Sequence, residues 1–328
     1  MQLLDCTLRD GANVVGRGFS AELTTLMIEG LIRNNIRIIE MGNAMGMGMD
    51  QDKSTLTDEQ YLDLVSPYLN EAKIGMFIGE KNAVSANIEL AASKGLKFLR
   101  VGANAGDGGL AEEGIKKIKQ AGMEAHYSMM KGYILSSEDL ADEAARLESF
   151  GVDEVTLMDS AGTMLSEQVF RYITQMVNKV KIPVGFHGHN NLGLSVANAL
   201  VAEQAGAAVL DCGLMGMARS AGNLATEMAV GVFQRMGKLQ DIDFYGLLSF
   251  IDDQLAPQMA TYHYKAAVSP YDLILGLSGC HSSFSSLFEA VARDKEVNLY
   301  QLIVEVSKIN QKTPSRDLME QVAKKIRS

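Results

Sequence analysis

At residues 185–191 the chain reads Gly185-Phe186-His187-Gly188-His189-Asn190-Asn191. This stretch follows a short apolar segment, 180–184, and precedes an expected helix over Leu194–Gln204. Side chains two positions apart on a strand point to the same side, so His187 and His189 aim at one point. Two imidazoles placed in this way at the end of a strand indicate two of the ligands of a metal site. The alternative is a pair of hydrogen-bonded histidines inside a barrel.

The composition is that of a globular protein and argues against several classes of protein. Of the 328 residues, 47% are hydrophobic and 21% are charged, and the net charge is −10. This charge argues against nucleic acid as a partner. No apolar run is long enough to span a bilayer, and the first residues lack the pattern of a signal peptide. Three cysteines give no disulfide framework, so we expect a cytoplasmic protein without a membrane partner.

One unit recurs from the first residue to about Gly237: a short apolar run, a polar turn, an amphipathic helix and a Gly or Asn. The apolar runs, taken as strands, are Leu3–Cys6, Ile36–Met41, Ala72–Ile78, Leu96–Val101, Met123–Met129, Glu154–Met158, Val184–Phe186 and Ala208–Cys212. The expected helices are Ala21–Asn34, Thr57–Leu69, Ala83–Lys94, Leu110–Gln120, Glu138–Phe150, Ser166–Asn178, Leu194–Gln204 and Leu224–Met236.

Eight consecutive strand–helix units predict an α/β fold, a (β/α)8 TIM barrel over residues 1–237. The alternative is an open doubly wound sheet, but no dinucleotide-binding glycine pattern follows the first strand. Residues 238–328 contain helical patterns alone, so we expect a C-terminal helical extension. These patterns cover Phe244–Ala260, Tyr271–Leu277, Phe284–Arg293, Leu299–Ile309 and Arg316–Ile326.

Polar residues gather where the expected strands end, the face on which TIM barrels carry their chemistry. Asp10, just after the first strand, is the best charged ligand to accompany the two histidines. This set suits Mn²⁺ or Mg²⁺, with Zn²⁺, Co²⁺ and Fe²⁺ as alternatives. Asn223 either completes the set or supports it, and Glu40 either supports it or forms an ion pair with Arg9 or Arg100.

Arg9 stands beside Asp10, and a cation next to a guanidinium is suited to binding a 2-oxo acid. Arg9 would then stabilise the negative charge of an enolate. Ser160 lies in the turn after the sixth strand, where its hydroxyl could hold a carboxylate; the alternative is a plain strand-to-helix turn. The uncharged segment 42–49, rich in Met and Gly, is either a lid over the substrate or a disordered loop.

Four motifs together resemble the DRE-TIM metallolyase superfamily, and most of all its 4-hydroxy-2-oxovalerate aldolases. They are Thr7-Leu8-Arg9-Asp10-Gly11, Asp159-Ser160-Ala161-Gly162, Gly185–Gly193 and Ala221-Gly222-Asn223. The superfamily also contains hydroxymethylglutaryl-CoA lyase and isopropylmalate synthase. The resemblance implies that Asp10, His187 and His189 bind the metal, that Arg9 stabilises the enolate and that Ser160 lies near the substrate carboxylate.

The chain departs from the aldolase pattern at two positions. Asn13 stands where the aldolases carry a histidine base, and a carboxamide cannot take a proton from a hydroxyl at neutral pH. His281 stands where they carry a tyrosine before Ser282-Ser283-Phe284. We therefore expect His281 or His126 to be the base, although His281 could be an exposed loop residue. Arg219 precedes Ala221-Gly222-Asn223 and either binds an extra anionic group of the substrate or is a surface cation.

These features predict a divalent-metal-dependent aldolase that cleaves or forms a 4-hydroxy-2-oxo acid through a metal-bound enolate. Its substrates would be pyruvate, or a similar 2-oxo acid, and an aldehyde. The alternatives are a Claisen-type acyltransferase that condenses acetyl-CoA with a 2-oxo acid, and a non-catalytic binding protein on the same barrel. The resemblance implies an acylating aldehyde dehydrogenase as a partner, and we also expect a homo-oligomer.

Overall fold

The computed structural model describes residues 1–49, 55–280 and 282–327. The chain divides into two compact units, Met1–Ala229 and Val230–Ser328. This division falls within a helix, eight residues before the boundary at 237 that the sequence suggests, and the sequence-based boundary stays a prediction. None of the described helices is both long and apolar enough to cross a membrane.

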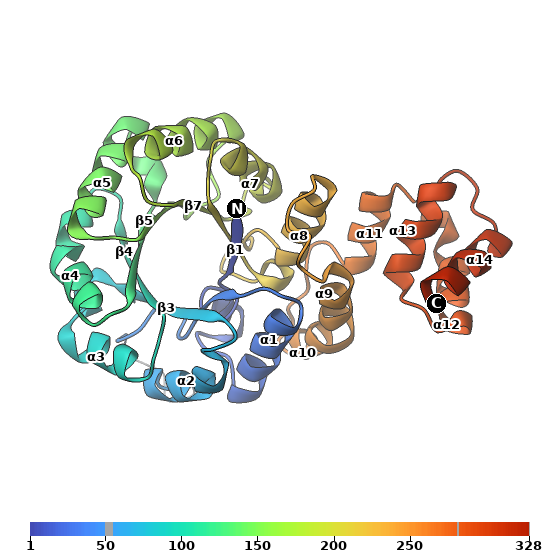
Figure 1. Cartoon of the computed structure of the whole chain (residues 1–328), viewed down its shortest axis with the longest axis horizontal. Helices are drawn as coiled ribbons and strands as arrows, with labels where there is room; N and C mark the ends of the chain where they lie inside the picture. The colour runs from blue at the N-terminus through green and yellow to red at the C-terminus, as the bar shows by residue number, and fades with distance from the viewer. Residues whose placement is uncertain (50–54, 281, 328) are drawn as a thin grey trace. The chain divides into compact units, whose positions relative to one another are not determined.

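The first unit is a closed barrel of parallel strands surrounded by helices (Figure 1), as the sequence predicts. Each strand pairs with its neighbours in sequence, and β1 closes the ring by pairing with β8. The strands are β1 (Gln2–Asp5), β2 (Ile38–Met41), β3 (Lys73–Gly79), β4 (Phe98–Asn104), β5 (Glu124–Met130), β6 (Glu154–Asp159), β7 (Val184–Gly188) and β8 (Val209–Cys212).

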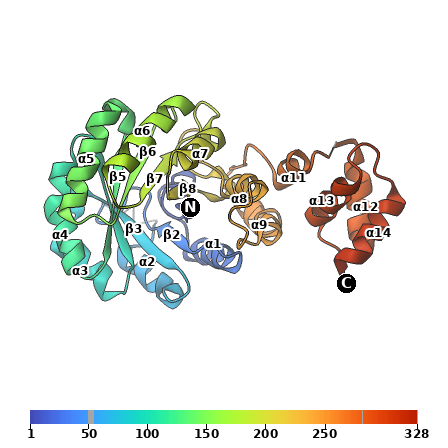
Figure 2. The ribbon, with the colours of Figure 1, turned by 45° about the horizontal axis from the view of Figure 1, so that its top comes forward.

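Helices follow the strands and lie outside the ring in both ribbon views (Figure 2). They are α1 (Ala21–Arg33), α2 (Asp58–Val65), α3 (Ser85–Ser93), α4 (Glu112–Gln120), α5 (Ser137–Phe150), α6 (Ser166–Lys179), α7 (Ser195–Gln204) and α8 (Thr226–Arg235). Side-chain caps fix several of their starts. Ser136, for example, accepts a hydrogen bond from the backbone N–H of Asp139, and Gly151 ends the same helix with a φ of 101°.

Aromatic side chains fill the barrel because glycines on neighbouring strands make room for them. A Cβ at Gly102 would lie 2.2 Å from the Phe77 ring, and one at Gly75 would lie 2.4 Å from the Phe98 ring. Phe98 packs with Leu4, Cys6 and Val209 in a buried cluster inside the ring. The interior of the barrel is therefore a packed core, not an open channel. Its polar side chains lie in some layers of this core and at its ends.

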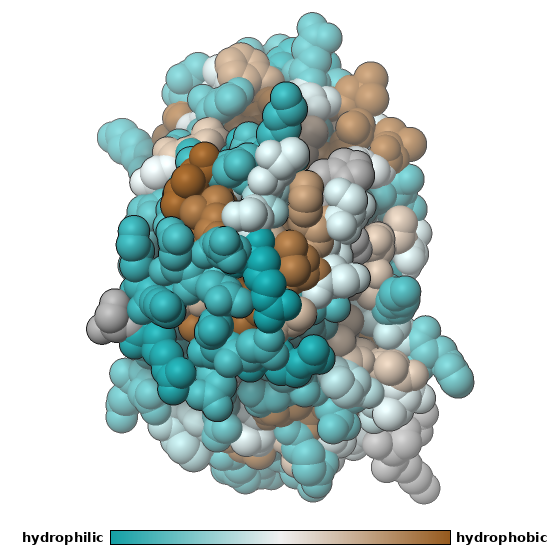
Figure 3. All heavy atoms as spheres, turned by 90° about the vertical axis from the view of Figure 1, so that its right-hand side faces the viewer, coloured by the Kyte–Doolittle hydropathy of each residue, from teal (hydrophilic) through white to brown (hydrophobic). Residues whose placement is uncertain are grey.

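The second unit is helical, as predicted. Its helices are α9 (Phe244–Phe250), α10 (Ala256–Ala260), α11 (Pro270–Ser278), α12 (Ser285–Lys295), α13 (Leu299–Ile309) and α14 (Arg316–Arg327). On α14 the apolar Met319, Val322 and Ala323 are buried. Figure 3 shows the face on which α12–α14 lie: most of its side chains are hydrophilic, and the apolar ones form separate areas.

One expected helix, Phe244–Ala260, is interrupted by a π-helical turn over Ile251–Leu255. Pro257 follows two residues after this turn and has no N–H to donate, so the regular hydrogen-bond ladder cannot pass through it. The N–H of Ala256 instead bonds to the carbonyl of Ile251, five residues back. The path stays helical, but its hydrogen-bond register changes.

Candidate active site

The ends of β1, β7 and β8 bring the predicted metal ligands together. After β1 the chain turns sharply, because the N–H groups of Arg9 and Asp10 both donate to the carbonyl of Cys6, at 3.1 and 2.8 Å. His187 lies within β7. His189 follows it and is fixed by a hydrogen bond from its N–H to the carbonyl of Asp159, and by a bridge to Asn223.

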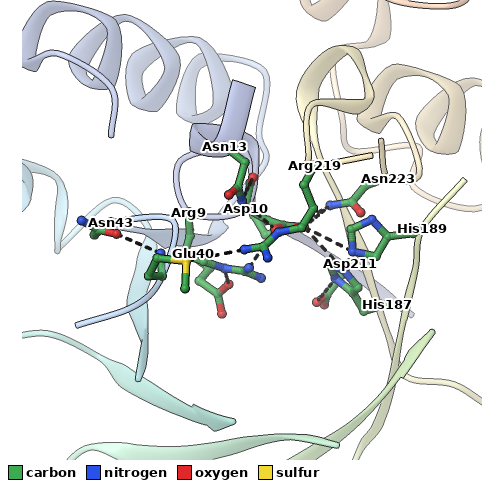
Figure 4. Close-up of polar contacts among 12 residues, drawn as sticks. Arg9, Asp10, Asn13, Glu40, Asn43, His187, His189, Asp211, Arg219 and Asn223 are labelled. Atoms are coloured by element: carbon green, nitrogen blue, oxygen red, sulfur yellow. Dashed lines mark hydrogen bonds and ion pairs between the residues drawn. The ribbon is translucent and has the colours of Figure 1, made fainter. Parts of the chain in front are cut away.

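Asp10, His187 and His189 surround a common point (Figure 4). The Nε2 atoms of His187 and His189 lie 3.7 and 3.8 Å from Oδ2 of Asp10, which is too far for hydrogen bonds. One ligand atom from each residue lies within 4.8 Å of the other two. Neighbouring ligands of a cation bound at about 2.1 Å stand about 3 Å apart, so a small contraction would complete the geometry.

Among the described residues, three buried polar atoms of this group have no hydrogen-bond partner: Nε2 of His187, Nδ1 of His189 and Oδ1 of Asn223. Unpaired buried polar groups are costly, so such atoms usually face a ligand or an ion. The Nδ2 group of Asn223 donates to Oδ2 of Asp10 at 2.8 Å. Asn223 thus holds the carboxylate in place and presents a free oxygen, and the residues present fit a divalent cation.

The protonation states also suit a cation. Burial alone would raise the pKa of Asp10, but the charge of Arg9 and the two histidines outweigh it, and this pKa lies well below the usual range. Burial, together with His187, lowers the pKa of His189 to about 4. Asp10 is therefore ionised and His189 neutral at pH 7, the forms in which both residues bind metals.

A chain of buried charges connects Arg9 to the ligand His187. Nε of Arg9 lies 2.6 Å from Glu40, whose other oxygen lies 2.5 Å from Nε of Arg100. Nη1 of Arg100 lies 2.7 Å from Oδ2 of Asp211, and the same oxygen lies 3.0 Å from Nδ1 of His187. We call Arg9, Glu40, Arg100, Asp211 and His187 the buried charge chain. Glu40 forms both ion pairs that the sequence suggested as alternatives.

The sequence indicates Arg100 only as a possible partner of Glu40 and predicts no role for Asp211. Both side chains are fully buried. A charged residue inside an otherwise apolar strand must find a partner of opposite charge, and this signal was present in β4 and β8. What the sequence did not show is that the two residues meet each other across the barrel.

Ser160 and Asn13, two further residues singled out in the sequence, are not among the three residues of the metal group. Ser160 is half-buried after β6, and its Oγ accepts a hydrogen bond from the N–H of Lys131 at 2.9 Å, which leaves its proton for another acceptor. Asn13 donates from Nδ2 to the carbonyl and to Oδ1 of Asp10, at 2.8 and 3.3 Å. Asn13 therefore supports the loop that carries Asp10.

His126 does not join the other predicted residues. It lies in the amino-terminal half of β5, where its register partner is Glu154, the first residue of β6. Its ring stacks on Phe98 with centroids 4.4 Å apart, and Nε2 lies 3.0 Å from Glu124. This placement, away from the carboxyl ends of the strands, removes its support as the base. His281, the other candidate, lies outside the described residues.

The segment 42–49 is fixed by backbone contacts. Ala44 donates to the carbonyl of Arg17, and Met47 pairs with β3 at Ile78. Met45 and Met49 remain exposed. The described part is thus an ordered loop, and whether it closes over a substrate stays a prediction.

A barrel whose strand ends carry two histidines and an aspartate beside a buried arginine defines a class of metal-dependent TIM-barrel enzymes. A family model described as HMGL-like matches residues 1–253, and the chain belongs to this family.

Curated relatives lead to the same class. The 4-hydroxy-2-oxovalerate aldolase of Carboxydothermus hydrogenoformans is 32% identical, over 98% of this chain and 96% of the relative. The protein of that name from Serratia proteamaculans is 33% identical, over 86% of this chain and 85% of its own length. These matches confirm the predicted superfamily and the interpretation of the chain as an enzyme, a lyase of the aldolase type.

Solved structures confirm the fold. The HMG-CoA lyase of Bacillus subtilis superposes with a TM-score of 0.66 at 18% identity, over 79% of this chain and 93% of that one. The carboxyl transferase domain of Rhizobium etli pyruvate carboxylase superposes with a TM-score of 0.68 at 16% identity, over 98% of this chain and 60% of that one. Identities this low carry the barrel architecture alone.

Proposed function

We propose that this enzyme cleaves a 4-hydroxy-2-oxo acid to pyruvate, or a similar 2-oxo acid, and an aldehyde, or catalyses the reverse addition. The observation that carries the proposal is the Asp10–His187–His189 group, with an unpaired Nε2, directly beside Arg9. The curated relatives named 4-hydroxy-2-oxovalerate aldolase support the same reaction type.

Arg9 has one nitrogen available for the substrate. Its Nε binds Glu40 and its Nη1 lies 3.0 Å from Asp10, whereas Nη2 is buried and has no partner among the residues that the structure describes. A fixed guanidinium with a free N–H is suited to stabilising a developing negative charge on a substrate oxygen. A divalent cation held by Asp10, His187 and His189, with Asn223 as a further ligand, would supply Lewis-acid stabilisation of the same charge.

Cleavage then needs one proton acceptor and one proton donor. A base removes the proton of the C4 hydroxyl, the C3–C4 bond breaks, and its electron pair moves into the enolate while the aldehyde carbonyl forms. Protonation of C3 completes the 2-oxo acid. We propose that Ser160 holds the substrate carboxylate through its available hydroxyl proton and that Arg219 contacts the substrate. Asn13 cannot act as the base, and we propose His281 for that role.

Several finer assignments belong to the same proposal. The mixed nitrogen and oxygen donors suit Mn²⁺ or Mg²⁺, with Zn²⁺, Co²⁺ or Fe²⁺ as alternatives. By resemblance to the aldolases, we propose an acylating aldehyde dehydrogenase as a partner, and also a homo-oligomer. A cytoplasmic location is supported by the three cysteines, all within the described residues, which form no disulfide.

The test is exchange of the C3 protons of pyruvate in D₂O, followed by proton NMR. The protein is loaded with Mg²⁺, or with Mn²⁺ that is chelated before the spectrum is recorded. We expect exchange that requires both the protein and the metal and that EDTA abolishes. Other 2-oxo acids are compared in the same way. Absence of exchange with every 2-oxo acid, in protein shown to contain metal, would contradict the proposed function.

A further inference from the structure

The exposed side chain of Arg219 lies close to the candidate metal group (Figure 4). It belongs to the loop that follows β8, and its Nη2 lies 3.8 Å from Sδ of Met45 in the loop that follows β2. Strands β8 and β2 are the two neighbours of β1 in the barrel. Because Arg9 and Asp10 lie in the turn after β1, the contact between Arg219 and Met45 joins the loops on either side of that turn (Figure 4).

The loop that carries Arg219 is tied to the end of β7. The carbonyl of Arg219 accepts a hydrogen bond from the N–H of Gly222, and the carbonyl of Gly222 accepts one from Asn190. Nδ2 of Asn191 donates to Oγ of Ser220 at 2.7 Å. Since Asn190 and Asn191 directly follow the ligand His189, the position of Arg219 is coupled to that of the metal group.

The charge of Arg219 is not compensated by a carboxylate in the part of the chain that the structure describes. Arg9 and Arg100 each contact two carboxylates, whereas the contact of Arg219 is the thioether of Met45. Arg219 is exposed, so its N–H groups are accessible to an anionic group of a bound substrate.

The proposed reaction determines which part of the substrate could supply that anion. In the proposed reaction the keto oxygen of the 2-oxo acid faces the metal group and Arg9, and its carboxylate faces Ser160. The portion of the molecule that projects outward begins at C3 and contains the aldehyde-derived half.

We propose that Arg219 forms a subsite for a second anionic group, a carboxylate or a phosphate, on the aldehyde half of the substrate. This inference rests on the proposed aldolase function and narrows its substrate class to aldehydes that carry a terminal negative charge. The guanidinium provides planar, paired N–H donors that suit either anion.

The test compares matched charged and neutral aldehydes in addition to pyruvate by the metal-loaded enzyme. One pair is 4-oxobutanoate and its methyl ester, and the other is glyceraldehyde 3-phosphate and glyceraldehyde. We expect kcat/KM to favour the charged member of at least one pair by about tenfold or more, chiefly through KM, because charge-assisted hydrogen bonds contribute at this level. The pair with the larger preference distinguishes carboxylate from phosphate.

The variants Arg219→Met and Arg219→Glu should remove or reverse the preference, and Arg219→Lys should retain part of it. Arg33→Met, at an exposed arginine of α1 on the outside of the barrel, is the matched control and should keep the full preference. The preference should also fall as salt is added. Equal kcat/KM within both pairs, or a preference that survives Arg219→Met, would overturn this inference. Proton exchange into pyruvate, measured separately on the wild type, reports whether the aldolase function itself holds.

Discussion

At the scale of single residues, each ligand of the candidate metal group has a different source of support. His187 is oriented by Asp211, His189 by the backbone of Asp159, and Asp10 by Asn223 and Asn13. Asp10 supplies the negative charge of the group, and its pKa lies well below the usual range. The affinity for a divalent cation should therefore depend on Asp10 more than on any supporting residue.

Replacement of Asp10 by Asn tests this dependence. The variant keeps the size of the side chain but loses the anionic ligand, so we expect the affinity for Mn²⁺ to fall about a hundredfold or more. The measurement is calorimetric titration of Mn²⁺ into metal-free protein, together with the metal content after desalting. Asp142→Asn removes a charge from the exposed face of α5 and serves as the control. Equal Mn²⁺ affinities in Asp10→Asn and wild type would show that the metal is bound elsewhere.

The identity of the base is a second question at this scale. We expect His281→Ala to lower kcat by about a hundredfold or more and to remove one limb of the pH–rate profile, since general bases contribute 10²–10⁴-fold. His126→Ala should instead lower the melting temperature, because its ring is buried against Phe98 and bonded to Glu124. If His281→Ala kept full turnover while His126→Ala lost it with an unchanged melting temperature, the assignment proposed here would be wrong.

At the scale of strands and helices, the pattern of apolar runs predicted the architecture closely. Helix α13 has the predicted ends, and all eight barrel strands overlap their predicted ranges. The prediction succeeded because each unit is local: a buried strand, a capped helix and a glycine can be read within about 30 residues. The π-helical turn before Pro257 was missed, although the proline itself was the available signal.

The site was predictable only where a motif or a strand end revealed it. The rings of His187 and His189 lie 5.2 Å apart at the end of β7, and their spacing in the sequence predicted that they meet. The pairing of Arg100 with Asp211 joins β4 to β8, whose residues are 111 positions apart, and no local pattern records such a contact. The contact between Arg219 and Met45 joins two loops and was likewise invisible in the sequence.

The buried charge chain makes a prediction about β4 and β8. Since a ring that binds a cation through Nε2 carries its proton on Nδ1, His187 would donate to Asp211. Asp211→Asn keeps an acceptor but loses the charge that faces Arg100 and His187. We expect the affinity for Mn²⁺ to fall about 10- to 100-fold, because the residues that orient metal ligands contribute at this level. Calorimetric titration of the metal-free variant measures the change.

The buried charge chain also predicts an effect on stability, which can be measured in the absence of metal and so independently of metal binding. Arg100→Met leaves Glu40 without one partner and Asp211 without its arginine, and an uncompensated buried charge costs about 3–5 kcal/mol. Urea denaturation with chelator present should show this loss for Arg100→Met. An unchanged Mn²⁺ affinity in Asp211→Asn would show that the buried charge chain does not support metal binding. Wild-type stability in Arg100→Met would show that it does not stabilise the fold.

At the scale of the whole molecule, the first unit buries two carboxyl groups, Asp5 and Glu227, that form no ion pair with any described residue. Thr226 and the N–H of Thr7 donate to Asp5, and the N–H of Met215 donates to Glu227. Burial is the main cause that raises the pKa of Asp5 to about 6 and that of Glu227 to about 7. Asp5 joins the end of β1 to the first residue of α8, and Glu227 joins α8 to the turn after β8, so their ionisation affects contacts between several elements of the barrel.

A raised pKa in the folded state means that the folded protein binds the proton more tightly than the unfolded chain. The contribution of Glu227 is therefore fully present below its unfolded pKa of about 4.5 and is lost as pH rises through about 7. His189 acts in the opposite direction, because its pKa is lowered to about 4. A difference between wild type and a Glu227 variant removes the contribution of His189 and isolates that of Glu227.

Glu227→Gln keeps the acceptor for Met215 and removes the titration. With chelator present, we expect the variant to gain stability relative to wild type as pH rises from 5 to 8, by up to about 3 kcal/mol. Urea denaturation of both proteins at each pH measures the free energy of unfolding. Glu289→Gln, which removes an exposed carboxylate of α12, tests whether the loss of a charge alone is sufficient. Parallel pH profiles for Glu227→Gln and wild type would mean that Glu227 titrates alike in the folded and unfolded chains, and that the buried carboxyl does not couple the barrel to pH.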